Sequence, residues 1–194
     1  MNMINDLSIA SEMSTSEYDV TKRKTSRDKA FCISDKPDLS DPITRVIGMT
    51  SVAVSSMHSY IVSAEISDDS TNDDPIVNVR CPDKNGQYYN RKIHVNDVNP
   101  SSATDMEMFA YLSWNDHIGN RVPGSISSWS CYRAQEMTAS KVDNSPDGFI
   151  NVIHNAYEYI KESISMLSKI NHIDAKRLVL EGKSLIGIFD KSRT

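Results

Sequence analysis

The sequence is poor in the residue patterns that carry common enzyme and cofactor chemistry. Glycine is scarce: the seven glycines do not cluster, so no glycine-rich loop is available to hold a phosphate group. No GxSxG motif, GxGxxG motif or Walker loop occurs. These absences argue against nucleotide binding and serine hydrolysis of the usual kinds.

Cysteine, basic charge and long apolar runs are also scarce. Cys32, Cys81 and Cys131 are widely separated, odd in number and in no CxxC pair, which indicates neither a disulfide framework nor a zinc site. A net charge of −5 makes a nucleic-acid partner unexpected, because such proteins concentrate Lys and Arg on one face. No apolar run approaches the ~20 residues that span a bilayer, and residues 1–13 show no secretory leader pattern. We therefore expect a soluble, cytoplasmic protein without a membrane partner.

Two regions of different composition follow one another along the chain. Residues 1–40 are rich in Ser, Thr, Asp and Lys, and their few apolar residues show no period, which predicts a disordered or mobile N-terminal arm. The basic cluster Lys22 to Lys29 is interpreted as a solvated linker, with contact to an acidic partner or RNA as the alternative. Residues 41–194 are predicted to form a single domain.

Alternation of apolar and polar residues predicts three antiparallel strands in the first half of that domain. Residues 60–66 alternate strictly, residues 76–81 follow an acidic turn, and residues 87–95 alternate again. The turn Asn85-Gly86 joins the last two, and we expect positive φ at both of its residues. These strands predict a small antiparallel meander.

Helical spacing predicts helices after the strands. Ser102 and Asp105 resemble a capping box before the first helix, and a second helix is expected from Ser125. The strongest pattern predicts one amphipathic helix from Pro146 to Ile170, and a short helix is expected from Ile173 to Gly182. The predicted fold class is thus α+β: a small antiparallel β-meander packed against helices, with a long C-terminal amphipathic helix.

Within the predicted helix 146–170, the apolar stripe is long for a domain of this size. Ile153 and Ile160 are predicted to lie in the core, whereas Leu167 and Ile170 in the last turns are predicted to contact a partner.

Three segments resemble a family of bacterial proteins that is common in clostridia. They are Ser-Asp-Asp-Ser-Thr-Asn-Asp-Asp-Pro-Ile-Val-Asn-Val (67–79), Val-Asn-Asp-Val-Asn-Pro (95–100) and Glu-Met-Phe-Ala (107–110). The similar region runs from about residue 48 to about residue 137. This family is uncharacterised, without an assigned activity, substrate or active-site residue, so the resemblance implies no function.

An acidic turn offers the first candidate for chemistry. Asp68, Ser70, Asn72 and Asp74 place oxygen atoms at alternate positions, as a calcium loop does. Counted from Asp68, the Gly and Glu that an EF-hand requires are replaced by Asp and Val. We interpret the segment as an Asx-rich turn before a strand, with a weak adventitious cation site as the alternative.

The histidines form no recognisable ligand motif. His154 and Glu158 are expected one turn apart on the helix 146–170 as an exposed pair, and His94 is expected on a polar strand face. His172 and Asp174 follow that helix. A metal site needs at least three convergent ligands, so none is predicted.

Cys131 is the best candidate for a nucleophile, because a thiol near a helix start can have a lowered pKa. Asp116 and His117 could reach it only if the intervening loop folded back, and no family signature surrounds it. We interpret Cys131 as a half-buried small hydrophobe.

The sequence therefore indicates no catalytic, cofactor-binding or metal-binding residue, and we expect no cofactor. It favours a non-enzymatic interaction or structural protein that binds a protein partner, or a second copy of itself, through the C-terminal helix. Two other classes stay open. One is an enzyme whose cleft is built by the loops Asn115 to Pro123 and Ser55 to Ser59, and the other is an adaptor or chaperone of an export or appendage system.

Overall fold

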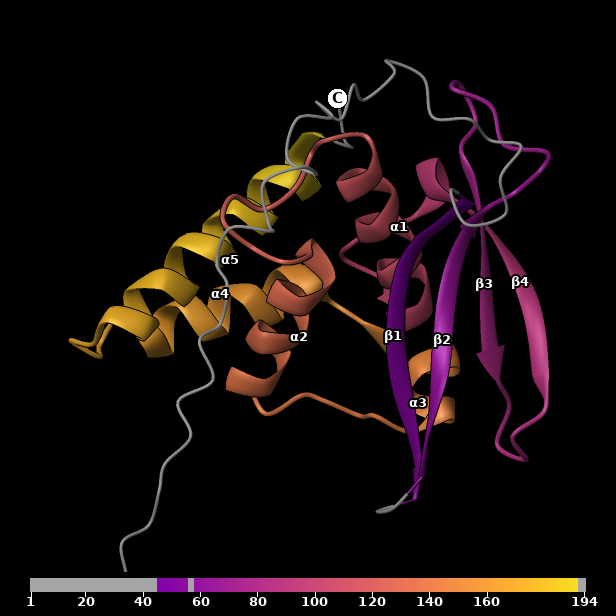
Figure 1. The fold of residues 1–194 in the computed structure, drawn as a ribbon. Helices are drawn as coiled ribbons and strands as arrows, with labels where there is room; N and C mark the ends of the chain where they lie inside the picture. The colour runs from indigo at the N-terminus through magenta and orange to yellow at the C-terminus, as the bar shows by residue number, and fades with distance from the viewer. Residues whose placement is uncertain (1–44, 56–57, 192–194) are drawn as a thin grey trace, which may run out of the picture. The chain divides into compact units, whose positions relative to one another are not determined.

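A four-stranded antiparallel meander forms one side of the fold, and the helices lie on the other side (Figure 1). The computed structural model describes residues 45–55 and 58–191. The strands pair in sequence order and are β1 (Val46–Ser55), β2 (His58–Ile66), β3 (Ile76–Pro82) and β4 (Tyr88–His94). The predicted α+β class and antiparallel meander are confirmed.

The alternation in β2 sets which face of the sheet meets the helices. Val62 and Ala64 are buried, whereas Ile61 on the opposite face is exposed and Ser63 is half-buried. Gly48 of β1 allows the close approach of α1 (Asp105–His117), because a Cβ atom there would lie 2.2 Å from the Ser113 hydroxyl. The core between the layers contains Phe109, whose ring lies 5.2 Å from that of Trp129.

The turn between β3 and β4 differs from the prediction in one residue. Gly86 has a φ of +79°, but Asn85 is not in the left-handed region. The Gly86 N–H donates to the Asp83 carbonyl, and the Asp83 carboxylate accepts from the N–H groups of Asn85 and Gln87. Asp83 thus organises the turn, and a single left-handed residue completes it.

We expect Gly86→Val to destabilise the protein by about 1–2 kcal/mol or more, because a side chain is strained at this φ and its Cβ would lie 2.6 Å from the Tyr60 hydroxyl. Gly124→Val is the matched control, since Gly124 also has positive φ but has no atom within 4 Å of a Cβ. Denaturant midpoints measure both. A smaller loss for Gly86→Val than for Gly124→Val would contradict this account.

Five α-helices and three short elements follow the sheet in the described chain. They are η3 (Val95–Asp97), β5 (Ala103–Thr104), α1, α2 (Ser128–Thr138), α3 (Pro146–Asn151), β6 (Ile153–His154), α4 (Ala156–Leu167) and α5 (Ile173–Lys191). The predicted cap of α1 is wrong: Thr104, not Ser102, is the N-cap, and Glu107 completes the capping box. Helix α2 begins three residues later than predicted, after the N-cap Ser127.

The single helix predicted from Pro146 to Ile170 is also wrong, because the helical conformation is interrupted at residues 152–155. Ile153 and His154 form β6, which pairs with β5, and Asn155 then caps α4 by accepting from the Glu158 N–H. The break turns Ile153 to solvent, so its predicted core position is wrong. Ile160 is fully buried as predicted.

The long C-terminal amphipathic helix is α5, which continues past Gly182, where the sequence predicted its end. Gly182 lets α5 approach its neighbours closely: a Cβ there would lie 3.1 Å from Gln135 of α2 and 3.1 Å from Ile164 of α4. Among the described residues, the helices are too short or too polar to cross a membrane. The arm predicted for residues 1–40 lies outside the described residues.

Candidate functional site

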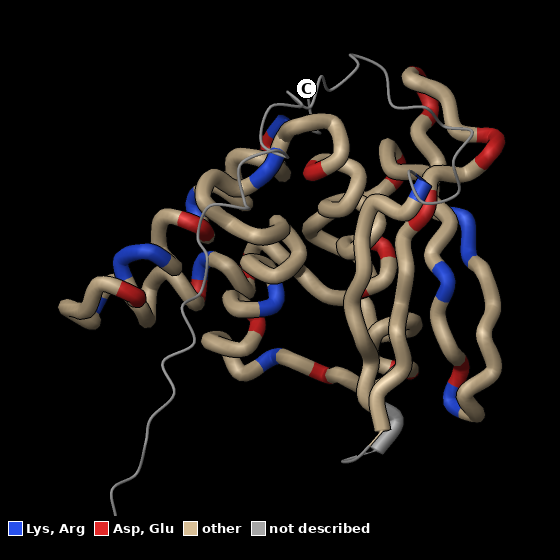
Figure 2. Tube along the Cα trace, viewed as in Figure 1, with Lys and Arg blue, Asp and Glu red and all other residues tan. Residues whose placement is uncertain are grey.

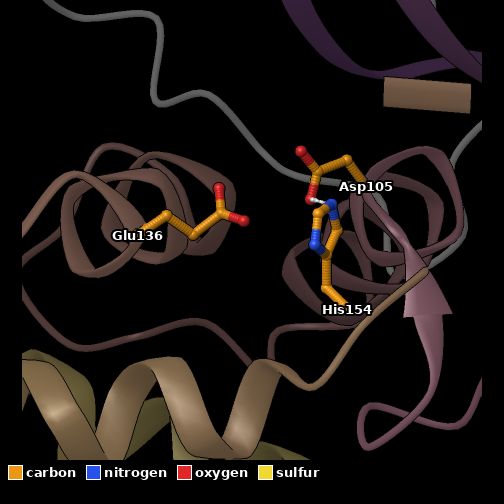
Figure 3. Close-up of side chains that lie close together, drawn as sticks. All are labelled: Asp105, Glu136 and His154. Atoms are coloured by element: carbon orange, nitrogen blue, oxygen red, sulfur yellow. Dashed lines mark ion pairs between the residues drawn. The ribbon is translucent and has the colours of Figure 1, made fainter. Parts of the chain in front are cut away.

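Three segments that are distant in sequence bring Asp105, Glu136 and His154 together inside the protein. Asp105 is the first residue of α1, Glu136 lies on α2, and His154 lies on β6. All three are buried, and one potential ligand atom from each lies within 4.8 Å of the others. Glu136 faces the Asp105–His154 pair from the opposite side (Figure 3). We call these three residues the polar cluster.

Arg133 bridges the two carboxylates of the polar cluster. Its Nη1 atom donates to Asp105 Oδ2 at 2.7 Å and to Glu136 Oε2 at 2.6 Å. Arg133 lies one turn before Glu136 on α2, and its guanidinium also packs over the Trp129 ring and donates to Asn144. The outer oxygen of each carboxylate is thereby fixed.

The inner atoms of the polar cluster lack such partners. Asp105 Oδ1, Glu136 Oε1 and His154 Nε2 are buried and accept or donate no hydrogen bond. His154 Nε2 lies 3.7 Å from Asp105 Oδ1, and its other ring nitrogen, Nδ1, lies 2.8 Å from the Tyr159 hydroxyl. Three buried polar atoms therefore face one another without direct hydrogen bonds, although such atoms nearly always have a partner.

Burial controls the ionisation of these carboxyl groups. Loss of hydration and the nearby charge of Asp105 together raise the pKa of Glu136 to about 8, although Arg133 opposes both effects. Burial also raises the pKa of Asp105, with Arg133 and His154 opposing the rise. Either carboxyl group is therefore costly to ionise unless a cation lies nearby.

Sequence reasoning missed this cluster. It treated Asp105 as a capping residue, passed over Glu136 and expected His154 to be exposed beside Glu158 on a helix, which is wrong. His154 is instead held in β6. The one available signal was the Arg133–Glu136 spacing on α2, which is also common on solvated helix faces.

The acidic turn behaves as an Asx-rich turn. Asp68 pairs with Arg45, Ser70 Oγ accepts from the Ile76 N–H, and the Asp74 carboxylate lies 3.1 Å from His94 Nδ1. His94 is exposed as predicted. The oxygen atoms of Asp68, Ser70 and Asp74 thus contact other residues of the protein. In the described residues, the group of three potential metal ligands is the polar cluster and not this turn.

The structure does not assemble a nucleophile around Cys131. Burial raises the pKa of its thiol to about 11, which is opposite to the shift an activated cysteine requires. Asp116 accepts two hydrogen bonds from Ser128, and the His117 ring packs beside Trp114. Cys131 is fully buried rather than half-buried.

The loops proposed to flank an enzyme cleft adjoin different parts of the protein. Gly48, near the start of β1, packs against Ser113 close to the end of α1. Ala53, near the other end of β1, donates to the carbonyl of Asn144. A hollow of about 340 Å³ is lined by Asn115 and Asn120 together with residues of η3 and α5, and not by residues 58 and 59.

A second feature lies on the surface, where α4 and α5 join. Leu167, Ile170, Val179 and Leu180 help to line a hollow of about 410 Å³ there. Of its apolar lining, Ile170 and Leu180 are exposed, and Met166 and Ile173 in the same stretch of the chain are exposed as well. We call this region, residues 166–180, the α4–α5 end. Ile170 was predicted to lie at a contact surface, whereas Leu167, predicted with it, is buried.

These features define an α+β protein with a four-stranded antiparallel meander, a buried polar cluster and an exposed apolar helix pair. No protein-family model, curated protein or solved structure matches the chain. The resemblance of residues 48–137 to a clostridial family therefore stays a prediction.

Proposed function

We propose that this is a non-enzymatic interaction protein and that the α4–α5 end binds a partner protein. The observation that carries the proposal is the exposure of large apolar side chains that line one hollow, with Ile170 50% and Leu180 65% exposed. Exposed apolar surface of this kind marks interaction sites in soluble proteins, because its burial against a partner removes it from water.

The charge around the hollow indicates the chemistry of the partner. Lys169 and Lys176 line it, and neither forms an ion pair with another residue of the described chain. Along the rest of α4 and α5, basic segments alternate with acidic ones (Figure 2). A peptide segment with apolar side chains between Asp or Glu residues would complement both the hollow and its lysines.

A random peptide library displayed on phage and panned against the full chain tests this proposal. We expect enrichment of apolar peptides that carry acidic residues. Leu180→Glu should weaken their binding about tenfold or more, because a large apolar contact contributes on the order of 1.5–3 kcal/mol. Lys169→Glu with Lys176→Glu should also weaken binding. Ile126→Glu is the matched control, since Ile126 is 91% exposed in the segment before α2 and should have no effect.

Three outcomes would overturn the proposal. The first is the failure of the folded protein to enrich acidic apolar peptides, and the second is peptide binding that Leu180→Glu leaves unchanged. The third is a dimer of the parent chain in light scattering that Leu180→Glu converts to a monomer, because a second copy of the chain would then be the occupant.

A further inference from the structure

We propose that Asp105, Glu136 and His154 bind a divalent transition-metal ion of the zinc class in a closed, structural site. The proposal is independent of the α4–α5 end. It rests on the inward-facing atoms Asp105 Oδ1, Glu136 Oε1 and His154 Nε2, which are buried, lack hydrogen-bond partners and lie within 4.8 Å of one another. One carboxylate oxygen from each acid and one imidazole nitrogen form a mixed ligand set that suits zinc and related ions.

The separation of the ligand atoms fits one shared ion. Zinc binds carboxylate oxygen and imidazole nitrogen at about 2.0–2.2 Å, so two ligands of a tetrahedral ion lie about 3.4 Å apart. His154 Nε2 and Asp105 Oδ1 are 3.7 Å apart, which is too long for a hydrogen bond and close to this value. Glu136 Oε1 lies within 4.8 Å of both atoms and would complete the set by moving toward the shared ion.

The surrounding residues orient the ligands in the way that outer partners do in metal centres. Arg133 holds Asp105 Oδ2 and Glu136 Oε2, which leaves the inner oxygen of each carboxylate free for an ion. The Tyr159 hydroxyl lies against His154 Nδ1, which directs Nε2 into the cluster. Such outer partners fix the rotamer and tautomer of ligands and strengthen metal binding.

The charges around the polar cluster also favour a bound cation. The titratable and charged groups that face the site are Asp105 of α1, Glu136 and Arg133 of α2, and His154 of β6, and Asp143 of the loop before α3 lies nearby. One guanidinium cannot balance two ionised carboxylates, so a bound divalent ion would supply the positive charge that both would need to ionise in a buried site. Tyr132, one turn before Glu136 on α2, places another buried hydroxyl beside Glu136 as a candidate fourth ligand.

The burial of the ligands determines the role of the ion. The side chains of Asp105, Glu136 and His154 are at least nine-tenths buried, so no substrate can reach an open coordination position. The ion would instead join α1, α2 and β6, which are distant in sequence, and binding it would stabilise the folded state.

Metal titration of the full chain, purified without a metal-affinity tag and treated with a chelator, tests the assignment. We expect one equivalent of Zn²⁺ by calorimetry, one equivalent of Co²⁺ with visible absorption bands, and a higher melting temperature with either ion. Glu136→Gln and His154→Gln should abolish stoichiometric binding. Tyr159→Phe keeps every ligand and should weaken binding by about tenfold to a hundredfold. His94→Gln is the matched control, because His94 is exposed and paired with Asp74, and it should bind as the parent does.

Circular dichroism on each variant establishes folding before titration, and Tyr159→Phe keeps the test decisive if a ligand variant does not fold. Absence of stoichiometric metal binding to the folded parent would overturn the proposal. It would show that protons or water molecules, and not a metal ion, satisfy the inward-facing atoms of the polar cluster. Full-strength binding by folded Glu136→Gln, His154→Gln or Tyr159→Phe would place the ion elsewhere and would also overturn it.

Discussion

Replacing Arg133 with methionine is expected to destabilise the metal-free protein by about 3–5 kcal/mol, because Asp105 and Glu136 would lose the guanidinium that bridges them inside the protein. Methionine keeps much of the volume of the arginine stem, so the loss of folding stability measures the contribution of the guanidinium charge and its hydrogen bonds. Chemical denaturation in the presence of EDTA measures it. Arg177→Met is the matched control: Arg177 is exposed and lies 4.0 Å from Glu181, so its removal should cost only ~0–1 kcal/mol.

The effect of Arg133→Met should also depend on pH, and its sign follows from the direction of the pKa shift. In the folded protein the pKa of Glu136 is about 8, above the ordinary value of 4.5 that applies in the unfolded chain. Its protonated form therefore favours folding below that unfolded value, and this contribution is lost as the pH rises through about 8. Removing Arg133 raises the cost of ionising both carboxyl groups. The difference in free energy of unfolding between variant and parent should therefore widen above about pH 8, where Glu136 ionises in the folded parent but stays protonated in the folded variant.

If the difference in free energy of unfolding between Arg133→Met and the parent does not change with pH, Arg133 is not coupled to the ionisation of the carboxyl groups. If Arg133→Met costs as little stability as Arg177→Met, the buried bridge contributes no more than a surface ion pair.

Features that depend on neighbouring residues could be predicted from the sequence. The strict alternation of β2 predicted which side chains are buried, because one face of that sheet packs against helices and the other meets water. Ser145 and Pro146 correctly predicted the start of α3, since the serine side chain accepts from the Gly148 N–H and proline needs no hydrogen-bond donor there.

Features that depend on distant pairing could not be predicted in this way. The spacing of Ile150, Ile153 and Tyr157 suits a continuous helix, yet the backbone of Ile153 pairs with Thr104, which lies far earlier in the chain. That pairing replaces the local helical hydrogen bonds and divides the predicted helix in two. No pattern within residues 146–170 predicts that this segment will pair with β5.

The polar cluster illustrates the same limit for a functional site. Asp105, Glu136 and His154 belong to three segments, and charged residues within helices are most often solvated, so their burial follows only from the packing of α1, α2 and β6. By contrast, exposure at Ile170 could be predicted, because the apolar stripe extends beyond what the sheet can cover.

Ile160→Glu is expected to prevent cooperative folding or to destabilise the protein by more than about 4 kcal/mol, because it places an ionisable carboxyl group at a position with 0% exposure. Ile160 lies on the face of α4 that belongs to the main core. Protonation of the new carboxyl group would relieve only part of the cost, since the polar group would still replace apolar packing. Thermal unfolding followed by circular dichroism measures the effect.

Ile173→Glu provides the contrast within the same pair of helices. Ile173 is 74% exposed at the first position of α5, where a carboxylate is favoured by the helix dipole, so stability should change by no more than about 0.5 kcal/mol. The same variant should lose binding to acidic apolar peptides, because Ile173 belongs to the α4–α5 end. A folded Ile160→Glu protein with parental stability would show that α4 does not pack on the core. An unfolded Ile173→Glu protein would show that the α4–α5 end is part of the core rather than a contact surface.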